Sequence, residues 1–344
     1  MRVRIRDFIE TVEGLYFAVN TYYHPEDRFF AFLRYVPYEF VDFDVDKNNI
    51  REINGRKYVK MAESQKAYKF LKEKFRKYLF YDETINVLMH AIPKEDIERI
   101  LSPKDRLNDI VNEENNLSEL EEKCRKLALI LEDYGIPIKS MGVSGSLLLK
   151  LNNKNSDIDF VIYGKDMHKK GREALKQAFE DNKLKPLSDN FWKIAYEKRI
   201  KDRTLTYEEF VFYEKRKFNR GIIDNTMFDL LFTREWNEIN EKYGDKKYKN
   251  LGFIQIEGRV LNDDFAFDNP AIYEIECYND EEIKEIVSFT HTYAGQCFNG
   301  EEIIARGKLE EVIDKNGNKY KRVVVGTTRE AFNEYIKIRT TSLL

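Results

Sequence analysis

The stretch that decides the fold is Gly142-Val143-Ser144-Gly145-Ser146, followed after ten residues by Asp157-Ile158-Asp159. In a β-strand, residues i and i+2 face the same side, so Asp157 and Asp159 project together while Ile158 enters an apolar face. Two carboxylates held close together repel each other and favour a cation between them, and oxygen ligands suit Mg²⁺. The Gly-Ser corner predicts backbone N–H groups and the Ser146 hydroxyl as a phosphate site.

Alternating helices and strands are expected around these motifs. Ser118 is expected to begin a helix that ends before Gly135, and residues 138–143 and 156–164 are expected to form strands. Helical stretches are expected over 166–184 and 188–217. A later strand, 226–233, carries Asp229 between Phe228 and Leu230, where an unpaired carboxylate is costly. Asp229 is therefore preferred as a third acid over Asp224, which precedes Asn225 in a turn-like position.

This combination, over residues 118–235, resembles the DNA polymerase β-like nucleotidyltransferase superfamily. The signature of that superfamily is Gly-Ser, then Asp-x-Asp after about ten residues, then a third acid on a neighbouring strand, and it is matched by Gly145-Ser146, Asp157, Asp159 and Asp229. The chain as a whole is similar to archaeal nucleotidyltransferases with added flanking modules.

The resemblance implies a magnesium-dependent enzyme that transfers NMP from an NTP, with ATP as the expected donor, to an acceptor hydroxyl. It implies two Mg²⁺ ions bound by Asp157 and Asp159, with Asp229 completing the site of one of them. It also implies that Gly145 and Ser146 position the donor phosphates.

Two basic residues are further candidates for contacts with nucleotide phosphates. Superfamily members that add CCA to tRNA, and small antitoxins, commonly follow Gly-Ser with a small residue and an arginine. This chain has Leu147-Leu148-Leu149-Lys150 instead, so Lys150 is the candidate replacement. Arg220 follows the basic run 215–217, which can reach a phosphate or can simply be a solvated helix end.

The fold class predicted is α+β: a polymerase β-like catalytic unit, a mixed sheet with helices, between two β-rich modules. Residues 1–105 are expected to hold β-hairpins, one at Asn54-Gly55, and a basic helix; residues 106–250 the catalytic domain; and residues 251–344 a mostly β module. The basic stretch 60–77 fits either a nucleic-acid backbone or a solvated helix with an aromatic core stripe.

Composition excludes several function classes. The 58 basic and 61 acidic residues nearly cancel, which excludes a uniformly basic nucleic-acid binder. No run of about 20 apolar residues predicts a membrane span, and neither a secretory signal nor paired cysteines are evident, so a cytoplasmic protein is expected. Four glutamines among abundant Lys and Glu are typical of thermophilic proteins.

The acceptor is less defined by the sequence. Two flanking modules favour a large acceptor, and RNA such as tRNA is preferred because no helix-hairpin-helix segment typical of DNA-acting relatives is found. Two alternatives stay open: a protein adenylyltransferase, and a non-catalytic nucleotide- or nucleic-acid-binding protein of the same fold. All three acids are present, which weighs against the latter.

Overall fold

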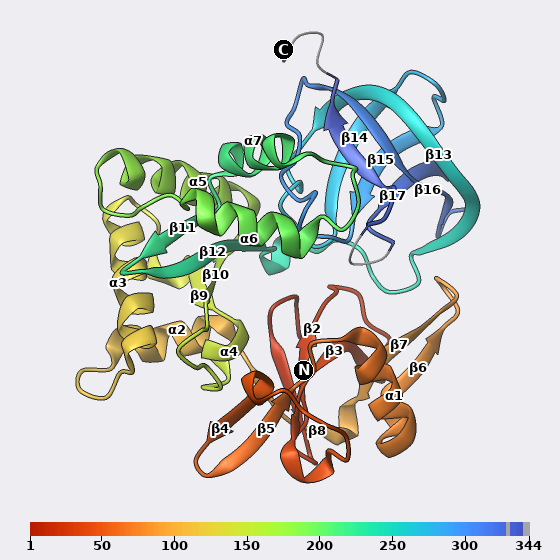
Figure 1. The fold of residues 1–344 in the computed structure, drawn as a ribbon. Coiled ribbons are helices and arrows are strands. Elements are labelled where there is room, and N and C mark those ends of the chain that lie inside the picture. Colours follow the sequence, from red (N-terminus) through yellow and green to blue (C-terminus); the bar gives the residue numbers. More distant parts are fainter. Residues whose placement is uncertain (328–330, 340–344) are drawn as a thin grey trace. The chain divides into compact units, whose positions relative to one another are not determined.

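A computed structural model describes residues 1–327 and 331–339. Contacts group the chain into two compact units (Figure 1). The first unit is Met1–Leu184 with Ile222–Tyr243, and the second is Lys185–Gly221 with Gly244–Leu344. The three sequence modules expected above, residues 1–105, 106–250 and 251–344, stay a prediction.

The first unit begins with an eight-stranded sheet. Its strands are β1 (Phe8–Thr11), β2 (Tyr16–Val19), β3 (Arg28–Pro37), β4 (Ile50–Ile53), β5 (Arg56–Lys60), β6 (Leu79–Asp82), β7 (Val87–Pro93) and β8 (Ile97–Leu101). The order is β4-β5-β3-β2-β1-β8, and β7 joins β3 to β6. Helix α1 (Ser64–Lys74) buries Ala67, Phe70 and Leu71 in the core on one face of this sheet. We call this assembly the N-terminal sheet.

The sequence predicts two hairpins in this region, one of residues 15–23 with 28–36 and one at Asn54-Gly55, and both are confirmed. Strands β2 and β3 pair antiparallel, and β4 pairs with β5. The second turn has φ of 50° at Asn54 and 78° at Gly55, the left-handed backbone that Asn-Gly favours. The basic helix, which the sequence predicts from Ala62 to about Phe80, ends at Lys74, because Phe75 leaves helical geometry at φ −141° and packs its ring against the core.

The remainder of the first unit is a mixed sheet covered by helices. Its strands are β9 (Met141–Val143), β10 (Ile158–Tyr163), β11 (Arg220–Ile223) and β12 (Thr226–Thr233), in the order β11-β12-β10-β9. Strand β10 runs parallel to β12 and antiparallel to β9. The helices are α2 (Pro103–Asn112), α3 (Glu119–Asp133), α4 (Gly145–Leu148) and α5 (Lys165–Glu180). As expected, Ser118 caps α3, in a capping box with Glu121.

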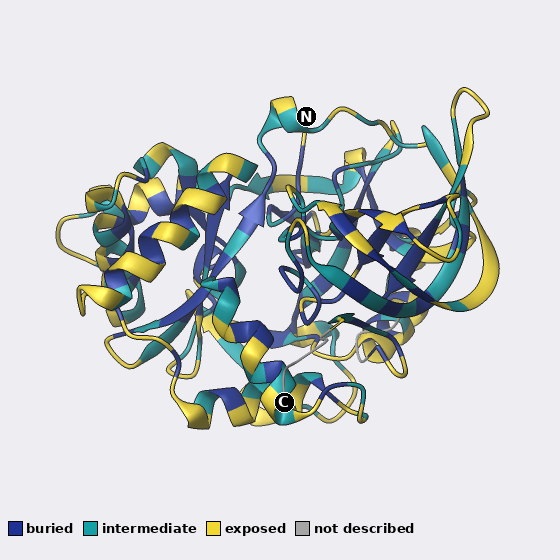
Figure 2. Cartoon of the chain, turned by 90° about the horizontal axis from the view of Figure 1, so that it is seen from above, coloured by how far each residue is buried: buried dark blue, intermediate teal, exposed yellow. Residues whose placement is uncertain are grey.

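Apolar side chains from both layers fill one core. Leu127 and Leu131 of α3, Leu175 of α5 and Phe160 of β10 are all fully buried in it. The helices are banded in blue and yellow in Figure 2, as expected for helices with one buried face. The strand expected at 138–143 starts only at Met141, because residues Ile138–Ser140 form a 3₁₀ turn after Pro137.

The second unit combines two helices with a closed sheet. Its elements are α6 (Asp189–Arg199), α7 (Tyr207–Lys217), β13 (Lys246–Asn262), β14 (Ala271–Cys277), β15 (Ile283–Ser288), β16 (Glu302–Asp314), β17 (Lys319–Val325) and β18 (Tyr335–Ile338). Strand β13 pairs with both β14 and β16, so the path β13-β14-β15-β17-β16 returns to its start. The expected pairing of 303–313 with 319–325 is confirmed.

Candidate active site

The three predicted acids lie on or next to two adjacent parallel strands. Asp159 on β10 is the register partner of Asp229 on β12, and Asp157 precedes β10 by one residue. The flanking partners Ile158 and Phe228 are completely buried. Alternation along the strands therefore sends the apolar side chains into the core and leaves Asp159 and Asp229 side by side on the other face, both half-buried.

Negative charge is concentrated at Asp159. Burial, followed by the charges of Asp157 and Asp229, raises the pKa of Asp159 to about 7. The positive charges of Arg6 and Arg34 oppose this shift without cancelling it. The site is therefore short of positive charge at the place where the acids meet, which is the electrostatic condition that favours a bound cation.

The Gly-Ser corner lies directly against Asp159. Gly145 has φ of +64°, and a Cβ added there would lie 1.9 Å from Asp159 Oδ2. The Ser144 backbone N–H donates to the Asp159 carbonyl at 2.9 Å, and this bond fixes the corner to β10. Glycine is required at position 145 both for the left-handed backbone and for the close approach of the carboxylate. Ser146, the next residue, is half-buried in the first turn of α4.

The leucines after this corner serve packing. Leu148, Leu149 and Leu151 are buried in a cluster with aromatic side chains of the N-terminal sheet, namely Phe8, Tyr16, Tyr35 and Tyr58. Lys150, between the last two leucines, is exposed and has φ of +56°. The leucines that stand here in place of the usual motif residues thus pack the N-terminal sheet against the Gly-Ser corner. A contact of Lys150 with nucleotide phosphates stays a prediction.

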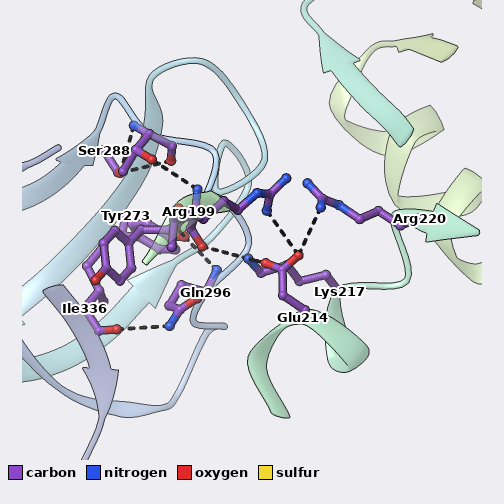
Figure 3. A network of polar contacts seen from close by, with 11 residues as sticks. Arg199, Glu214, Lys217, Arg220, Tyr273, Ser288, Gln296 and Ile336 are labelled. Carbon is purple, nitrogen blue, oxygen red and sulfur yellow. Dashed lines mark hydrogen bonds and ion pairs between the residues drawn. The ribbon is translucent and has the colours of Figure 1, made fainter. Parts of the chain in front are cut away.

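Arg220 belongs to an ion cluster in the second unit (Figure 3). Arg220 Nη1 lies 3.5 Å from Glu214 Oε2, and Arg199 Nη1 lies 3.3 Å from the same oxygen. Lys217 Nζ donates to Glu214 Oε1 and, at 2.9 Å, to the Thr292 carbonyl. Burial alone would raise the pKa of Glu214, but the charges of Lys217, Arg220 and Arg199 hold it at about 2. This arrangement gives Arg220 a structural partner, and its contact with a phosphate stays a prediction.

The rival acid Asp224 lies in the turn between β11 and β12. Asp224 and Asn225 both have positive φ, at 44° and 65°. The Asp224 side chain is exposed and forms an ion pair with Lys126 of α3 at 2.7 Å. Asp224 is therefore an exposed turn residue with an ion-pair partner on α3, whereas Asp229 lies within strand β12.

Helix α1, the candidate nucleic-acid surface, has several lysines paired with carboxylates. Lys66 lies 2.6 Å from Glu63, and Lys74 lies 2.5 Å from Asp42. Just beyond the helix, Lys77 lies 2.8 Å from Glu13. These pairs favour the interpretation of a solvated helix.

Basic residues of the N-terminal module lie near the acids, a placement that the sequence did not indicate, although Lys60 belongs to the basic stretch 60–77. Arg6 has φ of 79°, and its carbonyl accepts from Ser144 Oγ at 2.8 Å. Lys60 and Tyr35 both lie close enough to Asp157 and Asp159 for these charges to act on their pKa values. Only the docking of the sheet on the α4 leucines brings these residues to the site, so no local pattern could have shown them.

Oxygen donors and concentrated negative charge fit a hard cation such as Mg²⁺. Within residues 1–327 and 331–339, no three His, Cys, Asp or Glu side chains are already grouped as a metal site. The candidate ligands for such an ion are Asp157, which is exposed, and the half-buried Asp159 and Asp229.

Comparison with known proteins agrees with this geometry. Residues 124–223 match the model of a nucleotidyltransferase domain. The chain contains a nucleotidyltransferase domain of the polymerase β-like superfamily. The matched range of the nucleotidyltransferase domain includes Gly145, Ser146, Asp157 and Asp159 and ends before Asp229, so the place of the third acid rests on strand register.

A full-length relative is also found. The chain is 87% identical over 339 residues to "Uncharacterized protein MJ1086" of the archaeon Methanocaldococcus jannaschii. The aligned region covers 98% of this chain and 100% of that protein. No solved structure is significantly similar to the chain. None of the helices in the described ranges has the length and apolarity that crossing a bilayer requires.

Proposed function

We propose that this protein transfers NMP from an NTP, with ATP as the expected donor, to a hydroxyl of an RNA acceptor: the hydroxyl oxygen, on losing its proton, bonds to the α-phosphorus, and pyrophosphate leaves. The observation that carries the proposal is the pairing of Asp159 with Asp229 on parallel strands, with Asp157 beside them and Gly145 against the Asp159 carboxylate. A metal-assisted nucleotidyl transfer needs carboxylates grouped in this way beside a backbone corner that can bind phosphate.

The acids are the residues that would hold Mg²⁺. Asp157 and Asp159 would contact two ions and Asp229 one of them. When bound, the metal neutralises charge on the donor phosphates and lowers the pKa of the acceptor hydroxyl. The rigid partner strands hold Asp159 and Asp229 at a fixed separation, so the acceptor oxygen and the α-phosphorus can be positioned in line.

The Gly145-Ser146 corner would hold the donor phosphates. Its backbone is fixed to β10 by the Ser144 hydrogen bond, and position 145 has no side chain to block an approaching phosphate. The Ser146 hydroxyl can donate to a phosphate oxygen, and Lys150 and Arg220 are the further proposed phosphate contacts. This role is one of positioning, without a covalent intermediate.

The proposal is tested by incubating the protein and Mg²⁺ with each of four labelled NTPs and with RNA, DNA or protein as acceptor. We expect label to enter RNA, most strongly from one NTP, and the Asp159→Asn variant to show none. Label in protein alone would replace the RNA acceptor with a protein hydroxyl. Absence of label from every acceptor with every NTP would contradict the proposed activity.

A further inference from the structure

One face of the N-terminal sheet carries a group of basic residues. Residues directly opposite each other on paired strands share a face, and Lys60 lies opposite Tyr35, while Arg51 lies opposite Tyr58. Tyr35 and Tyr58 belong to the aromatic cluster that packs on Leu148, Leu149 and Leu151, at and just after the end of α4. Lys60 and Arg51 therefore lie on the face that meets the nucleotidyltransferase domain.

A bulge adds Arg34 to this group. Tyr16 pairs with Tyr35, but its neighbour Phe17 pairs with Leu33, so Arg34 is an extra residue in β3. A bulge of this kind redirects a side chain relative to regular alternation. The charge of Arg34 acts on the pKa values of both Lys60 and Asp159, so Arg34 lies near both of them.

These cations are poorly neutralised by the protein itself. Among the residues that the structure describes, neither Arg34 nor Lys60 has a side-chain hydrogen bond or ion pair. Arg51 donates from Nη1 to the Asn48 carbonyl and, at 2.9 Å, to the Ile50 carbonyl, but its Nε is buried without an acceptor in the described chain. All three side chains are half-buried. Burial and the charges of Arg34 and Arg51 lower the pKa of Lys60, and the charges of Asp157 and Asp159 oppose this shift without cancelling it.

We propose that Arg34, Arg51 and Lys60 form a phosphate-binding site beside Asp157 and Asp159, supplied by the N-terminal sheet. Half-buried cations with unused donors are stabilised by an anion, and phosphate oxygens accept several such hydrogen bonds at once. Leucines stand after Gly-Ser where related proteins commonly have an arginine, and these leucines pack against the N-terminal sheet. The sheet in turn places Arg34, Arg51 and Lys60 near the acids. The source of the phosphate rests on the proposed function. It is either the triphosphate of the donor NTP or the backbone of the acceptor strand.

Binding without Mg²⁺ tests this site independently of turnover. The probes are inorganic tripolyphosphate and a single-stranded RNA oligonucleotide, and the variant is Arg34→Ala/Lys60→Met. Its control is Lys57→Met, because Lys57 lies on the opposite side of β5 from Lys60 and is itself exposed to solvent. We expect the double variant to weaken binding of at least one probe by about tenfold or more, and the control to leave both unchanged.

The pattern of loss identifies the source of the phosphate. Weaker binding of tripolyphosphate alone assigns the site to the donor. Weaker RNA binding alone, with a salt slope smaller by about 1.4 for two lost phosphate contacts, assigns it to the acceptor. Unchanged binding of both probes overturns the proposal, even if the protein is an active transferase. Loss of binding in a protein that transfers no nucleotide leaves the phosphate site standing and contradicts the proposed function.

A stability measurement guards against a misfolded variant. Removing a half-buried cation from among like charges should raise the melting temperature, so Lys60→Met alone is expected to be at least as stable as the wild type. If the double variant does not fold, binding of tripolyphosphate and of RNA is measured with Lys60→Met instead. Weaker binding of either probe supports the phosphate site, and unchanged binding of both overturns it.

Discussion

At the scale of single residues, Asp159 is where the charges of the site converge. Its raised pKa means that the ionised carboxylate is disfavoured in the folded protein, by burial and by Asp157 and Asp229. In metal-free buffer at pH 8, Asp159→Asn should therefore be more stable than the wild type by about 1–3 kcal/mol, while losing transfer activity.

Magnesium should reverse this order. We expect Mg²⁺ to raise the melting temperature of the wild type, because the ion binds only the folded site, and to leave the variant almost unchanged. Thermal unfolding with and without the metal measures both effects. A variant that is less stable than the wild type without metal, or equally stabilised by Mg²⁺, would contradict the charge convergence at Asp159.

Gly145 is the second residue whose chemistry the site requires. Gly145→Ala should place a methyl group against Asp159 Oδ2 and lower activity by about 100-fold or more, because a small displacement of a catalytic group is costly. Gly55→Ala is the matched control: φ there is +78°, yet a Cβ would meet nothing within 4 Å. Both variants carry backbone strain of about 1 kcal/mol, but only the first should lose activity. Equal activity in the two would remove the steric argument.

At the scale of elements, α7 is fixed to its unit by Glu214. Glu214→Gln removes the carboxylate shared by Lys217, Arg199 and Arg220 and should destabilise the second unit by about 3–5 kcal/mol. Denaturant unfolding measures this difference. Glu208→Gln, exposed on the same helix, is the control and should cost far less.

The effect of pH follows from the direction of the Glu214 shift. Its pKa is about 2 in the folded protein against an ordinary 4.5, so its contribution is complete above pH 4.5 and is lost as pH falls toward 2. The stability gap between wild type and Glu214→Gln should therefore narrow over that range. A gap that stays constant down to pH 2 would contradict the assignment.

Elements with local signals were predictable. Asn54-Gly55 specifies a turn through its own backbone preference, and Ser118 specifies a helix start through its own side chain. Helix ends were less predictable: the helix expected to reach about Phe80 ends at Lys74, because Phe75 leaves helical geometry and packs its ring against the core.

At the scale of the whole molecule, the acids were predictable and their surroundings were not. Asp157, Asp159 and Asp229 follow from strand alternation within a few residues, which the sequence displays directly. Lys60 and Arg34 reach the acids only through packing between Tyr35 and the leucines near residue 149, a contact between distant parts of the chain. The grouping of 185–221 with the closed sheet likewise depends on long-range contacts such as Lys217 with Thr292.

The central claim is that Asp229 completes a catalytic site with Asp157 and Asp159, and one measurement tests it most directly. Initial rates of labelled NMP transfer are compared for Asp229→Asn and Asp224→Asn, two acids five positions apart that the structure places in a strand and in an exposed turn. We predict a loss of at least about 100-fold for Asp229→Asn and near wild-type rates for Asp224→Asn. Near wild-type transfer by Asp229→Asn would contradict the claim.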